Sequence, residues 1–63
     1  MTKTEIAIKI DELIVGQKAS RNKKILIDLL IEGLSYSEAA EKYELSEKQI
    51  YNIKRKWLEL VSG

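Results

Sequence analysis

Two helix-start patterns in the second half of the chain limit what it can fold into. Ser35 is followed three residues later by Glu38, and Ser46 is followed three residues later by Gln49. Each pair fits a capping box, in which the serine and the later side chain bond to each other's backbone N–H at the first turn of a helix. Because the two serines are eleven residues apart, the helix between them must be short.

Glycines divide the rest of the chain, which has no proline. Gly16 and residues 17–20 end one segment, and Ser20 is placed to cap the next. Gly33 ends that segment as a left-handed residue after a helix, with Leu34 folding back on the preceding turn. We therefore predict an all-α domain of four helices, at about residues 4–15, 21–32, 36–43 and 47–61.

Apolar residues recur at helical spacing in all four segments. Ile and Leu cover more than half of the helix at 21–32, which predicts a helix that is central to a bundle or shared with another chain. Ile8 and Val15 fall on the opposite face of the first helix from its main apolar stripe. Expected inward residues elsewhere are Ile6, Ala7, Ile10, Leu13, Ile14, Ala39, Ala40, Tyr43, Ile50, Ile53, Trp57, Leu60 and Val61.

The composition excludes several function classes. The chain has no Cys and no His, so it has no disulfide, thiolate zinc site or imidazole base. Asp11 and Glu12 are adjacent rather than facing, and no glycine-rich phosphate loop is present. We therefore predict no enzyme, catalytic residue, metal, cofactor or small-molecule ligand. No apolar run approaches the roughly 20 residues of a membrane span, and we expect a cytoplasmic protein.

The spacing of small and apolar residues over 36–55 is typical of a helix-turn-helix. Two short helices that cross at a tight turn need a small residue where they touch, and Ala40 supplies it. Leu45 can fill the gap at the turn, while Ile50 and Ile53 seal the contact from the second helix. The motif usually has glycine where this chain has Glu44, and a left-handed backbone there costs a non-glycine residue roughly 1 kcal/mol.

The segment EGLSYSEAAEKYELSEKQIYNIKRKWLEL, with the helix before it, resembles DNA-binding domains over residues 21–61. It is similar to the fourth region of bacterial sigma factors, to the C-terminal domain of LuxR-type response regulators and to small phage-encoded transcriptional regulators. The same pattern occurs in transposase N-terminal domains and small terminase subunits of phages. The resemblance implies that the helix at 47–61 lies in the major groove of double-stranded DNA.

Helical projection puts Lys48, Asn52 and Arg55 opposite the apolar stripe of that helix, where side chains can meet base edges. Asn suits adenine, whereas Arg and Lys suit guanine. The predicted base-reading residues are Glu47, Lys48, Gln49, Tyr51, Asn52 and Arg55. Helix N-termini and basic clusters suit phosphates. The predicted phosphate-contacting residues are Ser35, Tyr36, Ser37, Ser46, Lys56, Arg21, Lys23 and Lys24.

We therefore expect a sequence-specific DNA-binding protein, such as a small bacterial or phage transcriptional regulator. One alternative is a protein-interaction module, because residues 25–47 carry a net charge of −5 that suits a basic partner. Another is the DNA-binding part of a phage packaging or recombination protein. The Lys, Asn and Arg on the outward face of residues 47–61 favour DNA.

We predict one domain over residues 1–63, in which residues 20–63 bind DNA and residues 1–19 complete the bundle or dimerise. A single helix-turn-helix contacts few base pairs, so specific binding usually needs two units. Ile8, Val15 and the excess apolar surface of 21–32 suggest a homodimer. RNA polymerase or another protein could cover the same surface instead.

Overall fold

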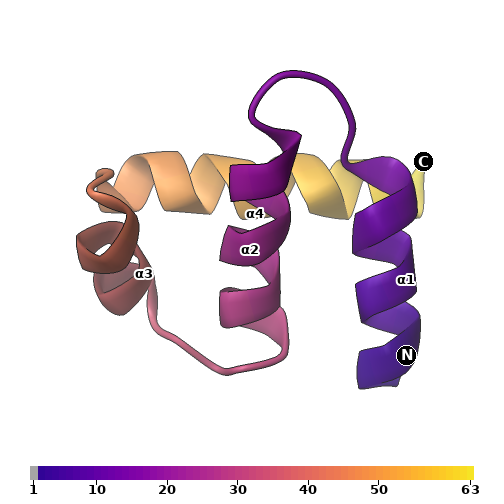
Figure 1. Ribbon diagram of the computed structural model, residues 1–63, viewed down its shortest axis with the longest axis horizontal. Coiled ribbons are helices and arrows are strands. Elements are labelled where there is room, and N and C mark those ends of the chain that lie inside the picture. Colours follow the sequence, from indigo (N-terminus) through magenta and orange to yellow (C-terminus); the bar gives the residue numbers. More distant parts are fainter. Residues whose placement is uncertain (1) are drawn as a thin grey trace.

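The computed structural model describes residues 2–63, so Met1, the predicted first residue of the domain, lies outside the described part. Residues 2–63 contain four helices and no strand, which confirms the all-α prediction. Helices α1 and α2 pack side by side, α4 runs across both, and α3 lies against the first half of α4 (Figure 1). The helices are α1 (Lys3–Leu13), α2 (Ala19–Leu30), α3 (Tyr36–Tyr43) and α4 (Glu47–Ser62).

The helix starts at α3 and α4 are the predicted capping boxes. The hydroxyl of Ser35 accepts a hydrogen bond from the backbone N–H of Glu38 at 3.1 Å, and that of Ser46 accepts one from Gln49 at 3.1 Å. Both later side chains bond back to the serine N–H at 2.9 Å. A third capping box, not predicted, joins Thr2 to Glu5 and starts α1.

The boundaries of α1 and α2 differ from the prediction by one or two residues. α1 ends at Leu13, because Ile14 is extended (φ −89°, ψ 109°). α2 begins at Ala19, so Ser20 lies inside the helix and the prediction that it caps the helix is wrong. The residue before α2 is Lys18, whose φ is +63° and whose side chain makes no capping bond. The left-handed backbone of Lys18 turns the chain so that α2 begins two residues before its predicted start.

α2, like α4, packs against all the other helices. It contacts α1, α3 and α4, and its Ile25 and Leu26 are fully buried. Part of its apolar surface is therefore used within the fold, as the first of the two predicted alternatives had it, while Ile27, Leu29, Leu30 and Ile31 at and just beyond its end are half-buried. The buried residues form two clusters: Ile10, Ile14, Leu26 and Trp57 join α1, α2 and α4, whereas Ile25, Ala39, Ala40 and Ile50 join α2, α3 and α4.

Leu60 is not buried, contrary to the prediction. It is 42% exposed, because α1 ends at Leu13 and leaves an open groove on that side of α4. Leu60 lies on one wall of this groove. None of the helices among residues 2–63 is long and apolar enough to cross a membrane.

Asp28 is a buried carboxylate that links α2 to α3, and it was not predicted. It is 8% exposed. The ammonium of Lys42 lies 2.8 Å from Oδ2 of Asp28, and the Tyr43 hydroxyl donates to the same oxygen. Burial raises the pKa of Asp28, but the hydrogen bonds from Lys42 and Tyr43 outweigh it and hold this pKa below its usual 3.8.

We expect Asp28→Asn to lower the free energy of unfolding at neutral pH by about 1–3 kcal/mol, since it leaves the buried groups poorly satisfied. Because the folded state depresses the pKa of Asp28, its stabilising effect is complete above the unfolded value and is lost as pH falls through the lower, folded value. The difference between parent and variant should therefore be constant from about pH 5 to about pH 9, where Lys42 and Tyr43 do not yet titrate, and shrink below about pH 5. Urea denaturation at a series of pH values measures it, and a constant difference down to acid pH would contradict this role.

Candidate nucleic-acid interface

The turn between α3 and α4 has the geometry that the motif requires. Glu44 adopts φ 55° and ψ 43°, so the predicted left-handed residue is confirmed. The N–H of Leu45 donates to the carbonyl of Ala40 at 2.9 Å, and the Leu45 side chain packs against the cluster that contains Ala40 and Ile50. The turn therefore fixes α4 against α3.

Replacing Glu44 with glycine should stabilise the protein, because glycine adopts this backbone without a steric penalty. The expected gain in the free energy of unfolding is about 0.5–1 kcal/mol, after the entropy that glycine adds to the unfolded chain is deducted. Glu44→Ala is the matched control, since it removes the same carboxylate but keeps Cβ. Thermal denaturation should rank glycine above the parent and leave alanine near the parent; equal gains in both variants would assign the effect to charge instead.

One face of α4 is solvent-exposed and polar. Lys48, Asn52 and Arg55, which we call the reading face, are spaced four and three residues apart and so share one side of the helix. Ile50 and Trp57 on the other side are buried. All six predicted base-reading residues are exposed: Glu47, Lys48, Gln49, Tyr51, Asn52 and Arg55.

Two of these side chains have partners within the protein. The side-chain oxygen of Gln49 accepts the N–H of Ser46 at 2.9 Å, which leaves mainly its amide N–H groups available to a ligand. Nε of Arg55 lies 3.5 Å from Oε1 of Glu59, and both side chains are exposed. An exposed ion pair of this kind is weak, so Arg55 can leave Glu59 for a stronger partner.

The start of α3 lies beside α4. The rings of Tyr36 and Tyr51 are 6.0 Å apart and nearly perpendicular. The ammonium of Lys54 lies 5.4 Å from the centre of the Tyr36 ring. Ser35 and Ser37 are exposed on either side of Tyr36. The structure thus brings the predicted phosphate-contacting residues of α3 next to the flank of α4.

The basic residues of α2 differ in whether they have a partner within the protein. Lys23 bonds to Asp11 of α1 at 3.2 Å, whereas Lys24 is exposed. The guanidinium of Arg21 donates twice to the side-chain oxygen of Asn22, at 3.2 Å in each case.

Asn22 was not predicted as a site residue. It lines the groove beside α4 together with Asn52 and the predicted Lys56. No sequence pattern connects Asn22 to α4, because only the packing of α2 brings the two together.

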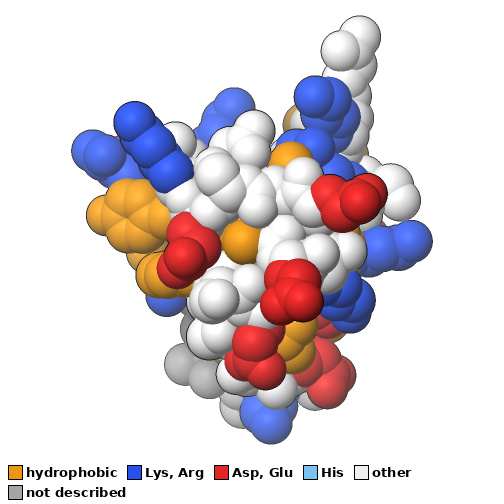
Figure 2. Space-filling view, turned by 90° about the vertical axis from the view of Figure 1, so that its left-hand side faces the viewer, with side chains coloured by type: hydrophobic (Ala, Val, Ile, Leu, Met, Phe, Trp, Pro, Cys, Tyr) orange, Lys and Arg blue, Asp and Glu red, His pale blue; other side chains and the backbone are white. Residues whose placement is uncertain are grey.

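The end of the molecule at which α3 lies carries charges of both signs. Figure 2, which looks onto this end, shows Lys and Arg around the margin of the view, at the upper left, top, right and bottom, while Asp and Glu lie across the middle and at the upper right. The exposed carboxylates of α3 and the following turn are Glu38, Glu41 and Glu44. Among residues 48–63 the net charge is +3. A polyanion would therefore be drawn to α4 rather than to the acidic side of α3.

Comparison with known proteins agrees with this geometry. A family model described as a helix-turn-helix domain matches residues 22–60, which cover most of α2, all of α3 and most of α4. No curated protein and no solved structure matches the chain. Because the match covers more than half of the sequence and its helices and turn have the required form, the chain belongs to the helix-turn-helix domain family.

Proposed function

We propose that the protein binds double-stranded DNA sequence-specifically, with α4 in the major groove and the reading face against the base edges. The observation that carries this proposal is the exposed set of Lys48, Asn52 and Arg55 on the outer side of the second helix of the motif. Asn can bond adenine through two hydrogen bonds, and Arg or Lys can bond guanine. The start of α3 would contact phosphates on one flank.

The biological task that we propose is transcriptional regulation in a bacterium or phage, carried out in the cytoplasm by binding and without catalysis. The resemblance to sigma-factor region 4, to LuxR-type domains and to phage regulators supports this choice. Packaging and recombination proteins use the same mode of binding, and the identity of the preferred DNA site would distinguish the tasks.

Titration of a labelled duplex at several salt concentrations tests DNA binding. The logarithm of the affinity should fall linearly with the logarithm of salt concentration, by about 0.9 for each phosphate neutralised. Arg21→Ala should weaken binding equally on all sequences, because a phosphate contact carries no base information. A parent protein that does not bind duplex DNA, or binds it independently of salt, would refute the proposed function.

We also propose that two copies of the chain act together on DNA. The structural support is Ile8, which is 51% exposed on the outward side of α1 and could pair with a second copy. Val15 lies at the groove beside α4 instead. Sedimentation with and without DNA measures the state of association, and Ile8→Lys should abolish the dimer. A monomer that remains a monomer on its DNA would end this proposal.

A further inference from the structure

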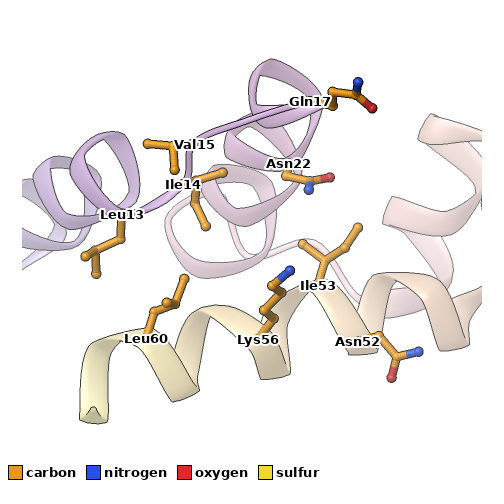
Figure 3. A pocket seen from close by; sticks show the side chains of 9 residues that line it. All are labelled: Leu13, Ile14, Val15, Gln17, Asn22, Asn52, Ile53, Lys56 and Leu60. Atoms are coloured by element: carbon orange, nitrogen blue, oxygen red, sulfur yellow. The ribbon is translucent and has the colours of Figure 1, made fainter.

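A groove of about 460 Å³ runs beside α4, on the side opposite the start of α3. Its other wall is the end of α1 and the turn that leads into α2 (Figure 3). Much of this wall lies outside the residues that match the helix-turn-helix family. The lining residues are Leu13, Ile14, Val15, Gln17, Asn22, Asn52, Ile53, Lys56 and Leu60.

The groove combines aliphatic side chains with polar groups that suit an anion. None of its lining residues is acidic, and Lys56 supplies a positive charge among them. Lys56 extends from α4 toward Asn22 across the groove (Figure 3). Within the described residues, no carboxylate lies within ion-pair distance of Lys56. Because Arg21 occupies the side-chain oxygen of Asn22, the amide N–H groups of Asn22 remain available as donors.

The groove is also continuous with the reading face. Asn52 stands at its edge, and its amide points away from the groove toward the outer side of α4 (Figure 3). Asn52, Lys56 and Leu60 follow one another at intervals of four residues, or about 6 Å along the helix axis. A linear ligand that runs beside α4 would meet them in order.

We propose that this groove holds the sugar–phosphate backbone of the DNA strand that flanks α4 on this side. Lys56 and Asn22 contact its phosphates, while Val15 and Leu60 pack against the deoxyribose carbons. This inference rests on the proposed DNA-binding function. It gives the end of α1 and the following turn a contact with one DNA strand, in addition to the contacts made by the helix-turn-helix.

Two pairs of variants test the groove by duplex titration. Lys56→Gln should weaken binding about eightfold at 0.1 M salt and reduce the salt slope by about 0.9, since one fewer counterion is released. Its control is Lys9→Gln, which removes an exposed lysine of α1 that does not line the groove. Val15 is 77% exposed, so the fold should accept a charge there. Val15→Glu should weaken binding more than Lys56→Gln, whereas Val15→Lys should bind at least as tightly as the parent.

The base preference of the variants distinguishes a contact made in the groove from one made by the reading face. The groove variants should bind every duplex with proportionally altered affinity and select the same site as the parent. If the parent binds DNA but Lys56→Gln and both Val15 variants bind like the parent at all salt concentrations, the groove inference is wrong and the proposed function stands. If the parent does not bind duplex DNA, the proposed function itself fails.

Discussion

Replacing Ile50 with alanine is expected to unfold a large fraction of the molecules at 25 °C. Ile50 is fully buried where α2, α3 and α4 meet, against Ile25, Ala39 and Ala40. Removing a buried aliphatic side chain of this size costs about 2–5 kcal/mol. The single core of a chain this short rarely supplies more than about 3–5 kcal/mol, so little stability would remain. Helical circular dichroism during urea denaturation measures the loss.

Leu60→Ala is the matched control for Ile50→Ala, because both changes remove an aliphatic side chain from α4. The half-exposed Leu60 should lose less than about 1 kcal/mol on truncation. Equal losses at the two positions, or a stable Ile50→Ala protein, would contradict the packing described for α4.

The second large effect is expected in DNA recognition. Asn52→Ala and Arg55→Ala should each reduce discrimination at one base pair by about 1–3 kcal/mol, which is roughly a 5- to 150-fold change. Affinities for the preferred duplex and for its single-base-pair variants measure this discrimination. Because Arg55 pairs with Glu59 in the free protein, Glu59→Gln is the control: it breaks the ion pair but keeps the arginine.

Glu59→Gln should therefore retain the base preference of the parent. The assigned reading face is wrong if both alanine variants discriminate between base pairs as well as the parent does.

The sequence predicts the part of the fold that local patterns determine. The starts of α3 and α4 follow from serine capping boxes, because the cap and its partner lie within one helical turn. The turn between them follows from the spacing of Ala40, Leu45 and Ile50. Glu44 adopts the left-handed conformation that its place in the motif predicts, although its residue type does not favour it.

Features that depend on packing between distant residues were not predicted. The left-handed backbone of Lys18 is local, but lysine does not favour this conformation, so the sequence predicts a later start for α2 than the structure has. The burial of Asp28 depends on Lys42 and Tyr43 of another helix. The exposure of Leu60 depends on where α1 ends. The burial of Asp28 and the exposure of Leu60 are decided by how two helices meet, which helical periodicity within one segment does not contain.

In the candidate site, too, the sequence predicts what one helix determines and does not predict what depends on packing between helices. Projection of α4 predicts an exposed face with Lys48, Asn52 and Arg55, and the structure exposes all three. Their roles in reading bases remain predictions. The groove formed by α4 and the α1–α2 turn was not predicted, because residues 13–22 approach Lys56 only in the folded chain.

Selection of bound sequences from a random duplex library tests the central claim, that the outer face of α4 reads duplex DNA. The parent protein and a Lys48→Ala, Asn52→Ala, Arg55→Ala triple variant are carried through the same rounds. Because the three residues are exposed, the triple variant should fold, which circular dichroism checks. We predict that the parent enriches one sequence motif, whereas the triple variant binds weakly and enriches none. Enrichment of the same motif by both proteins, or of no motif by the parent, would contradict the claim.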